Sequence, residues 1–356
     1  MRPGLIALLV TLLGGACTNP RAVIPTDITV RTVPDAVYRL ADPGRASTES
    51  WHFNLVVADA RNRAGIRPLR AEMEVLTGAT VLETIVLPEA TLEQMKLTSY
   101  LVTPETDELS TRRAFPLEEA FDFRLSFVGK PTAWKADRVR IHLTLEFPDS
   151  GTVTKSLDVP IRTFSQKTRL VFPLRGPAIV TQGRINNAGH SGHANQFALD
   201  VMGLNAEYGP MVDGPADNTQ YAGWGREIIA PAGGTVVYTR NDVPDNPPDA
   251  DPRDVYSNVP DPLQAIAGNC VVIDHGNGEF SVLMHLQQGS VSVQIADSVR
   301  QGQAIARLGN SGDSSGAHLH YQLQDGPELF RANSLPAAFD NLKDVNLARG
   351  VYFDAQ

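Results

Sequence analysis

The chain has 356 residues, of which 42% are hydrophobic and 20% charged, a composition typical of soluble globular proteins. This length is sufficient for two domains, each with its own core. The formal net charge of -9 leaves no basic excess to neutralise phosphates, so no nucleic-acid partner is expected.

The first residues have the pattern of an export signal. Arg2 precedes an apolar run at 5–13, which is too short to span a bilayer, and small residues at 14–16 lead to Cys17. This end resembles the lipobox of bacterial lipoproteins, although Leu13 lies four residues before Cys17 instead of three. We expect an exported protein, periplasmic or in the cell envelope, tethered to the membrane by a lipidated Cys17; ordinary cleavage nearby is the alternative. Residues 18–50, at first rich in Pro, Thr and Asp, are expected to form a tether.

Residues 51–164 are predicted to form an immunoglobulin-like antiparallel β-sandwich, because their apolar and polar residues alternate in short runs. The runs lie at 51–58, 71–76, 80–87, 121–128, 138–147 and 156–163, with one short helix near 88–97. His52 and His142 are expected to be surface or packing residues in this domain.

Glycine punctuates the second domain, predicted at 165–356, where short strands are again expected. They lie at 226–230, 234–240, 269–274, 280–286, 304–308 and 318–324. Between them, residues 241–262 contain six prolines and six aspartates, which predicts a long loop. This loop is interpreted either as a solvated insertion or as a wall of a substrate cleft. Cys270 lies in an apolar run and is expected to be a small buried core residue.

Six of the eight histidines lie in this second domain. A glycine- and serine-rich turn at 309–316 leads into His318-Leu319-His320, and alternate residues of a strand share a face. Taken alone, the pair has two interpretations. It is either a metal or acid–base site, or two solvated histidines on an edge strand. A catalytic zinc ion usually takes three protein ligands and leaves one position for water, and this domain has enough candidates.

Four segments together resemble the lysostaphin-type zinc metalloendopeptidases, also called the LytM fold, which cut peptides of bacterial peptidoglycan. The segments are 186–200, 229–237, 268–286 with His285 near its end, and 309–323. The resemblance covers roughly residues 166–330 and is most specific in the last two segments. It implies an all-β protein in which the sandwich is followed by an antiparallel β-sheet metallopeptidase domain.

The resemblance also implies roles for individual residues. Asp200 and His320 become zinc ligands, with an upstream histidine as the third, while His285 and His318 form a pair that activates the metal-bound water and stabilises the oxyanion. In the family the first histidine stands four residues before the aspartate, a position that Gln196 occupies here. The third ligand is therefore expected to be His190, with His193 as the alternative. His275 is expected to be a turn residue.

The function implied is a zinc-dependent endopeptidase of the bacterial cell envelope. It would hydrolyse peptide bonds in the stem peptides or cross-links of peptidoglycan by metal-activated water. The departure at Gln196 favours the alternative, which is a catalytically inactive lysostaphin-type domain that binds the wall or activates other cell-wall hydrolases.

Overall fold

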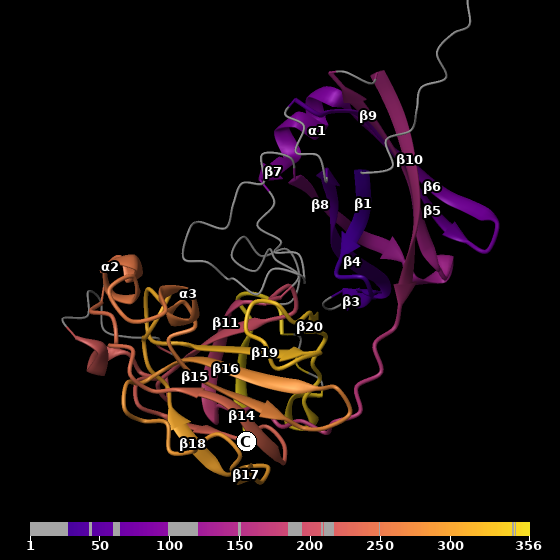
Figure 1. Cartoon of the computed structure of the whole chain (residues 1–356). Coiled ribbons are helices and arrows are strands. Elements are labelled where there is room, and N and C mark those ends of the chain that lie inside the picture. Colours follow the sequence, from indigo (N-terminus) through magenta and orange to yellow (C-terminus); the bar gives the residue numbers. More distant parts are fainter. Residues whose placement is uncertain are drawn as a thin grey trace, which may run out of the picture.

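The structure is a computed structural model. It describes residues 28–42, 45–59, 65–98, 120–148, 151–183, 194–207, 209, 217–248, 250–343, 345 and 347–356. These residues are nearly all in strands and their connections, as predicted, and Figure 1 shows how the strands are arranged. Within the described ranges, every helix is too short or too polar to cross a membrane. The export signal and Cys17 lie outside them.

The first half of the chain forms two five-stranded sheets. One contains β1 (Ile28–Val33), β3 (Leu40–Asp42), β4 (Arg45–Asp59), β7 (Lys96–Thr98) and β8 (Ala120–Pro131). The other contains β2 (Val37–Tyr38), β5 (Arg67–Thr77), β6 (Thr80–Pro88), β9 (Arg138–Phe147) and β10 (Gly151–Arg162). The short helix α1 (Glu89–Met95) follows β6, and the turn η1 (Thr132–Trp134) follows β8. Five of the six predicted runs lie within strands of these sheets, the run at 156–163 extends one residue beyond β10, and the predicted helix is present.

A single core holds the two sheets together as a sandwich. Trp51 and Phe53 of β4 share a buried cluster with Val139 and Ile141 of β9. In β9 buried residues alternate strictly with partly buried ones, because one face meets this core and the other faces outward. The immunoglobulin-like topology stays a prediction.

The tether predicted at 18–50 is wrong from Ile28 onwards. Residues 28–42 and 45–50 form β1, β2, β3 and the start of β4, and β1 pairs along its whole length with β4. Val37 of β2 is fully buried in the sandwich core. The Pro and Thr content of this stretch indicated a tether, but its apolar residues pair with strands far along the chain, a long-range contact that composition does not reveal.

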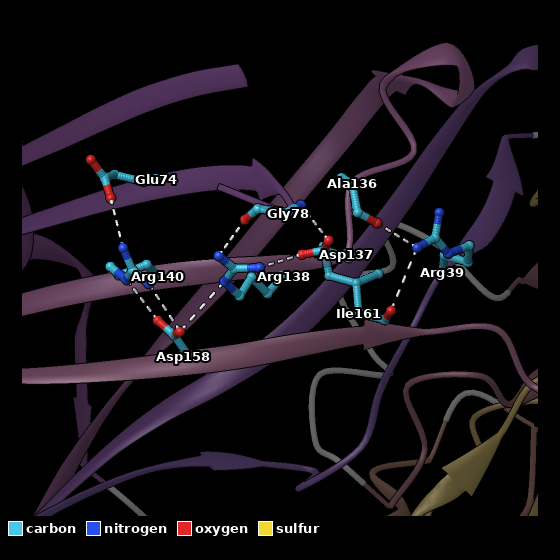
Figure 2. A network of polar contacts seen from close by, with 9 residues as sticks. All are labelled: Arg39, Glu74, Gly78, Ala136, Asp137, Arg138, Arg140, Asp158 and Ile161. Carbon is cyan, nitrogen blue, oxygen red and sulfur yellow. Dashed lines mark hydrogen bonds and ion pairs between the residues drawn. The ribbon is translucent and has the colours of Figure 1, made fainter. Parts of the chain in front are cut away.

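The outer face of the second sheet carries charged residues in cross-strand pairs (Figure 2). Arg140 of β9 lies between Asp158 of β10, 2.8 Å away, and Glu74 of β5, 3.9 Å away. All three occupy directly opposed positions in the strand register. Such exposed pairs contribute little stability each, but they favour this register over one shifted by a residue.

His52 of β4 gives the sandwich a dependence on pH. Its side chain is buried and its Nδ1 lies 2.9 Å from Ser126 Oγ. Burial lowers the pKa of His52 from 6.5 to about 4, with the charge of Arg124 adding to the effect. As the pH falls, the imidazole of His52 takes up a proton in the unfolded chain near pH 6.5 but in the folded protein only near pH 4. The stability that His52 contributes is therefore complete above pH 6.5 and falls as the pH drops towards 4.

We therefore expect the free energy of unfolding to fall by about 2 kcal/mol from this group between pH 6.5 and about pH 5. Urea unfolding at both pH values measures the loss. His52→Leu removes the titrating group and should show a correspondingly smaller loss. An equal loss in His52→Leu and in the unsubstituted protein would assign the pH dependence to other groups.

The second half is built on a nine-stranded antiparallel sheet. Eight of its strands follow the order β17 (Ser298–Val299), β14 (Gly234–Arg240), β15 (Asn269–Asp274), β16 (Phe280–Leu286), β19 (Leu319–Gln324), β12 (Leu199–Gly203), β11 (Gly176–Gln182) and β21 (Tyr352–Ala355). The ninth, β20 (Ser334–Leu335), pairs with β19, while β13 (Glu227–Ile229) and β18 (Ala304–Arg307) form a separate two-stranded sheet. The short helical turns are η2 (Asn218–Gln220), α2 (Pro252–Tyr256), α3 (Pro262–Ala265) and η3 (Asp340–Leu342). The boundary predicted after residue 164 falls between Ile161, in the core of the sandwich, and Leu170, in the core of this half.

Strand β19 lies near the centre of this sheet, between β16 and β12, and all six of its residues are buried. Leu319, Tyr321 and Leu323 pack into the main core of the domain. The alternate residues His320, Gln322 and Gln324 point to the opposite face. The strand therefore carries a row of buried polar side chains on one side of the sheet.

Candidate active site

Strand pairing brings Asp200 and His320 together. Asp200 lies in β12 directly opposite His320 in β19. The Nδ1 atom of His320 lies 2.9 Å from Oδ1 of Asp200, and both residues are less than 8% exposed. Two residues separated by 120 positions are thus fixed by two adjacent central strands, as the predicted ligand pair requires.

A β-bulge turns His285 towards the same place. Between the pairs Asn269–Leu286 and Val271–Leu283, β16 has one residue more than β15. His285 lies in this bulge with φ of 62°, a left-handed conformation that only a few per cent of residues other than glycine adopt. The bulge reverses the alternation of β16, so His285 joins the side that carries His320. The two ring centroids lie 5.8 Å apart.

His318 completes the cluster from the end of the glycine-rich turn. It precedes the first residue of β19, so the predicted strand begins one residue too early. Its ring centroid lies 4.7 Å from that of His285, and its Nε2 lies 3.7 Å from Asp200 Oδ1. The structure thus brings together Asp200, His285, His318 and His320. His190 and His193 lie outside the described residues, and the choice between them stays a prediction.

Backbone carbonyls determine which nitrogen of His285 and of His318 carries the proton. His285 Nδ1 lies 2.8 Å from the carbonyl oxygen of Ser311, and His318 Nδ1 lies 2.8 Å from that of Gly316. A carbonyl only accepts, so each Nδ1 donates and each neutral ring keeps its lone pair on Nε2. Burial lowers the pKa of His285 well below its usual value, with the neighbouring imidazoles adding to the effect, so His285 is neutral at neutral pH.

His320 lies between two hydrogen-bond acceptors. Its Nδ1 faces the Asp200 carboxylate, and its Nε2 lies 3.0 Å from Gln322 Oε1. A neutral imidazole has only one N–H, so the second contact requires an extra proton or a metal cation. Burial opposes the charged ring, but the hydrogen bond and the charge of Asp200 outweigh burial and raise the pKa of His320.

A chain of side-chain amides determines the orientation of Gln322. Gln324 Nε2 donates to the carbonyl of Gly326 at 2.7 Å, which turns Gln324 Oε1 towards Gln322. Gln322 Nε2 donates to that oxygen at 2.6 Å, and Gln322 Oε1 therefore faces His320. His320 Nε2 is thus held as a donor, which leaves Nδ1 as the atom available to a metal.

The two donors that lie among the described residues, the Asp200 carboxylate and the His320 imidazole, fit zinc. A carboxylate and an imidazole lone pair are zinc ligands, and a cation between Asp200 and His320 would take the place of the extra proton. Among the described residues, no third His, Cys, Asp or Glu completes a metal-binding group. Gln196 stands where the lysostaphin-type pattern has a histidine, and its buried Nε2 has no hydrogen-bond partner within the described ranges.

Two other candidate residues are occupied elsewhere. Cys270 is fully buried in a small apolar cluster, as predicted, and burial raises its pKa to about 12. His275 follows β15 and contacts Gly233 O at 2.9 Å and Ser281 Oγ at 2.7 Å.

Sequence reasoning missed Gln322, Gln324 and Ser311. The alternation in His320-Tyr321-Gln322-Leu323-Gln324 was the available signal, because it places both glutamines on the histidine's face. Alternation of this kind usually indicates a solvated face, whereas here neighbouring segments bury it.

Comparison with known proteins gives the family of this domain. The model of "Peptidase family M23" matches residues 219–331, a range that contains His285, His318 and His320 but not Asp200. The peptidoglycan DD-endopeptidase ShyA of Vibrio cholerae is 44% identical over 57 residues, which are 16% of this chain and 13% of that protein. An uncharacterized metalloprotease of Haemophilus influenzae is 41% identical over 56 residues, 16% of this chain and 11% of that protein. The chain thus matches a small part of the length of these relatives.

Solved structures with some likeness include a zinc containing peptidase from Vibrio cholerae, at 13% identity and a TM-score of 0.29, with 87% of this chain and 85% of that one covered. Another is the catalytic domain of lysostaphin from Staphylococcus simulans, at 15% identity and a TM-score of 0.26, with 45% and 88% covered. Residues 219–331 of this chain form a peptidase family M23 domain.

Proposed function

We propose that this protein is a zinc-dependent endopeptidase that hydrolyses peptide bonds in the stem peptides or cross-links of peptidoglycan. The observation that carries the proposal is the convergence of Asp200 and His320 with two further imidazoles whose Nδ1 atoms are already engaged. The named activity of the ShyA relative supports peptidoglycan as the substrate. The export signal and Cys17 predicted from the sequence support a place in the cell envelope, with a lipid tether.

In this proposal Asp200 and His320 hold the metal together with His190, or with His193 in its place. Bound zinc would lower the pKa of its water towards about 7 and polarise the scissile carbonyl. His285 is neutral because its pKa is low, and its Nδ1 donates to Ser311 O, so its Nε2 is the atom that accepts a proton from the attacking water. His318 holds its Nε2 on the same side, where it donates to the developing oxyanion after it has taken up a proton from the solvent.

Digestion of purified peptidoglycan tests this proposal. We expect the zinc-loaded protein to release muropeptides with newly formed peptide termini and intact glycan, identified by mass spectrometry. A protein that binds peptidoglycan without zinc and without cleavage would instead support the wall-binding or activator alternative. Cleavage of glycan bonds alone would contradict both.

Gln322 provides a test of metal binding that is independent of catalysis. Gln322→Leu removes the acceptor that holds His320 Nε2 as a donor, so the His320 ring is no longer restricted to the tautomer that presents Nδ1. We expect zinc affinity to fall about 10- to 100-fold, the usual effect of losing such a partner. Competition with a chromogenic chelator measures the affinity. Gln322→Glu keeps an acceptor for His320 Nε2 and should retain the zinc affinity. Equal zinc affinities of Gln322→Leu and the unsubstituted protein would show that Gln322 does not orient His320 for the metal.

A further inference from the structure

The loop at 241–262 is anchored to the turn that leads to His318. Asn246 is fully buried, and its side-chain Nδ2 donates to the carbonyls of Gly312 and Ser314, each at 2.8 Å. Its backbone N–H donates to the carbonyl of Asn310 at 2.9 Å. One asparagine thus binds three residues of the turn. The interpretation of the loop as a solvated insertion is wrong for this part.

The neighbouring Asp245 connects the same turn to the segment after His285. Its Oδ1 accepts from the backbone N–H of Asn310 at 2.8 Å, and its Oδ2 accepts from that of Gln288 at 2.9 Å. The beginning of the loop therefore bridges both segments that carry the catalytic pair.

The turn is also closely packed from the other side. Gly312 has φ of 77°, and a Cβ there would lie 2.3 Å from the backbone nitrogen of Gly268. Gly268 is equally restricted, since a Cβ on it would lie 2.4 Å from Ser311 O. The turn thus has the backbone of Gly268 against one side, and the Asn246 side-chain amide binds two of its carbonyls. It therefore has little freedom to move.

The turn, fixed in this way, forms hydrogen bonds with the imidazoles of His285 and His318. Ser311 O accepts from His285 Nδ1 at 2.8 Å. Ser314 donates through Oγ to Asn310 Oδ1 at 2.7 Å, and the same Oγ lies 3.0 Å from His318 Nδ1. The two carbonyls that Asn246 binds therefore belong to Ser314 itself and to Gly312, the residue next to Ser311.

We propose that Asn246 is a positioning residue for catalysis: it fixes the turn at 310–316 so that His285 and His318 both present Nε2 to the substrate. This inference rests on the proposed function. Asn246 Oδ1 is buried and accepts no hydrogen bond within the described residues, so the side chain acts through its two N–H donors. Its bonds reach neither Asp200 nor His320, which β12 and β19 hold by their own pairing.

The test compares Asn246→Ala with Asn258→Ala. Asn258 is exposed, lies in the same loop and donates one side-chain N–H to Asp254 O, within the loop itself. For Asn246→Ala we expect kcat on a soluble cross-linked muropeptide to fall about 10- to 100-fold, because a small displacement of catalytic groups costs that much. Zinc affinity and KM should stay within about two-fold of the unsubstituted protein, as should all values for Asn258→Ala.

A second readout needs neither metal nor activity. Nitrogen-15 NMR of the metal-free protein reports the tautomers of His285 and His318, both expected to be protonated on Nδ1 in the unsubstituted protein and in Asn258→Ala, and mixed in Asn246→Ala. If Asn246→Ala does not fold, Asn246→Ser, which keeps one donor, should show the same changes to a smaller extent. Unchanged tautomers and unchanged kcat in a variant that is merely less stable would overturn the proposal. Because the tautomers are measured without substrate, they test the positioning role even if the proposed activity is absent.

Discussion

Replacing His320 with alanine is expected to abolish both zinc binding and peptidoglycan hydrolysis. In the proposed function His320 supplies one of the two metal ligands that lie among the described residues, and Asp200 would lose the partner that lies 2.9 Å from it. Losing the metal removes several kcal/mol of transition-state stabilisation, so cleavage should fall by at least about 1000-fold. Elemental analysis measures the zinc content, and muropeptide release measures the rate.

His142→Ala is the matched control. His142 lies in β9 of the sandwich, and its Nδ1 lies 2.7 Å from Ser156 Oγ. This variant should keep both zinc and activity. Circular dichroism checks that His320→Ala retains its strands. A His320→Ala protein that keeps its zinc and cleaves at the normal rate would show that the metal lies elsewhere.

For His285 we expect the opposite combination, with zinc retained and catalysis lost. His285→Asn is the informative change, because asparagine tolerates the left-handed conformation that His285 adopts in the bulge. The variant keeps the backbone but lacks the Nε2 lone pair. Removing a general base of this kind should lower kcat about 100- to 10,000-fold.

The zinc content of His285→Asn, measured beside its kcat, separates the roles of the histidines. His142→Asn is the control for the substitution itself. Loss of zinc together with activity in His285→Asn would make His285 a ligand and contradict the division of roles. Full activity without the imidazole would exclude His285 as the base.

Much of the fold was predictable because its strands carry local signals. Alternation along β9 reflects one buried and one outward face, and the boundaries predicted for β9, β14, β15 and β16 agree with the structure. The strands β11, β12, β20 and β21 were not predicted. Three of them, β12, β20 and β21, have only two to five residues. The longer β11 pairs with β21, at the far end of the described chain.

The core of the site was predictable for a different reason. His318 and His320 stand two residues apart, and a family resemblance linked them to Asp200 and His285. The structure adds what spacing does not reveal: the bulge that redirects His285, and the carbonyls that determine each tautomer. The alternation from His320 to Gln324 puts both glutamines on the histidine's face, but it does not reveal that this face is buried, on which the amide chain depends.

The role of the loop also depends on long-range contacts. Its prolines and aspartates correctly predicted that it leaves the sheet, but Asn246 looks like an ordinary loop residue in the sequence. Only its bonds to Gly312 and Ser314, 66 and 68 positions away, distinguish it.

The most direct test of the proposed function is a zinc titration of cleavage. The protein is stripped of metal with a chelator, and hydrolysis of a cross-linked muropeptide is followed as zinc is added back. We expect no hydrolysis without metal and a rate that rises until one zinc ion is bound per chain, with no recovery in His320→Ala. Hydrolysis by the metal-free protein, or none at any zinc concentration, would contradict a zinc endopeptidase centred on Asp200 and His320.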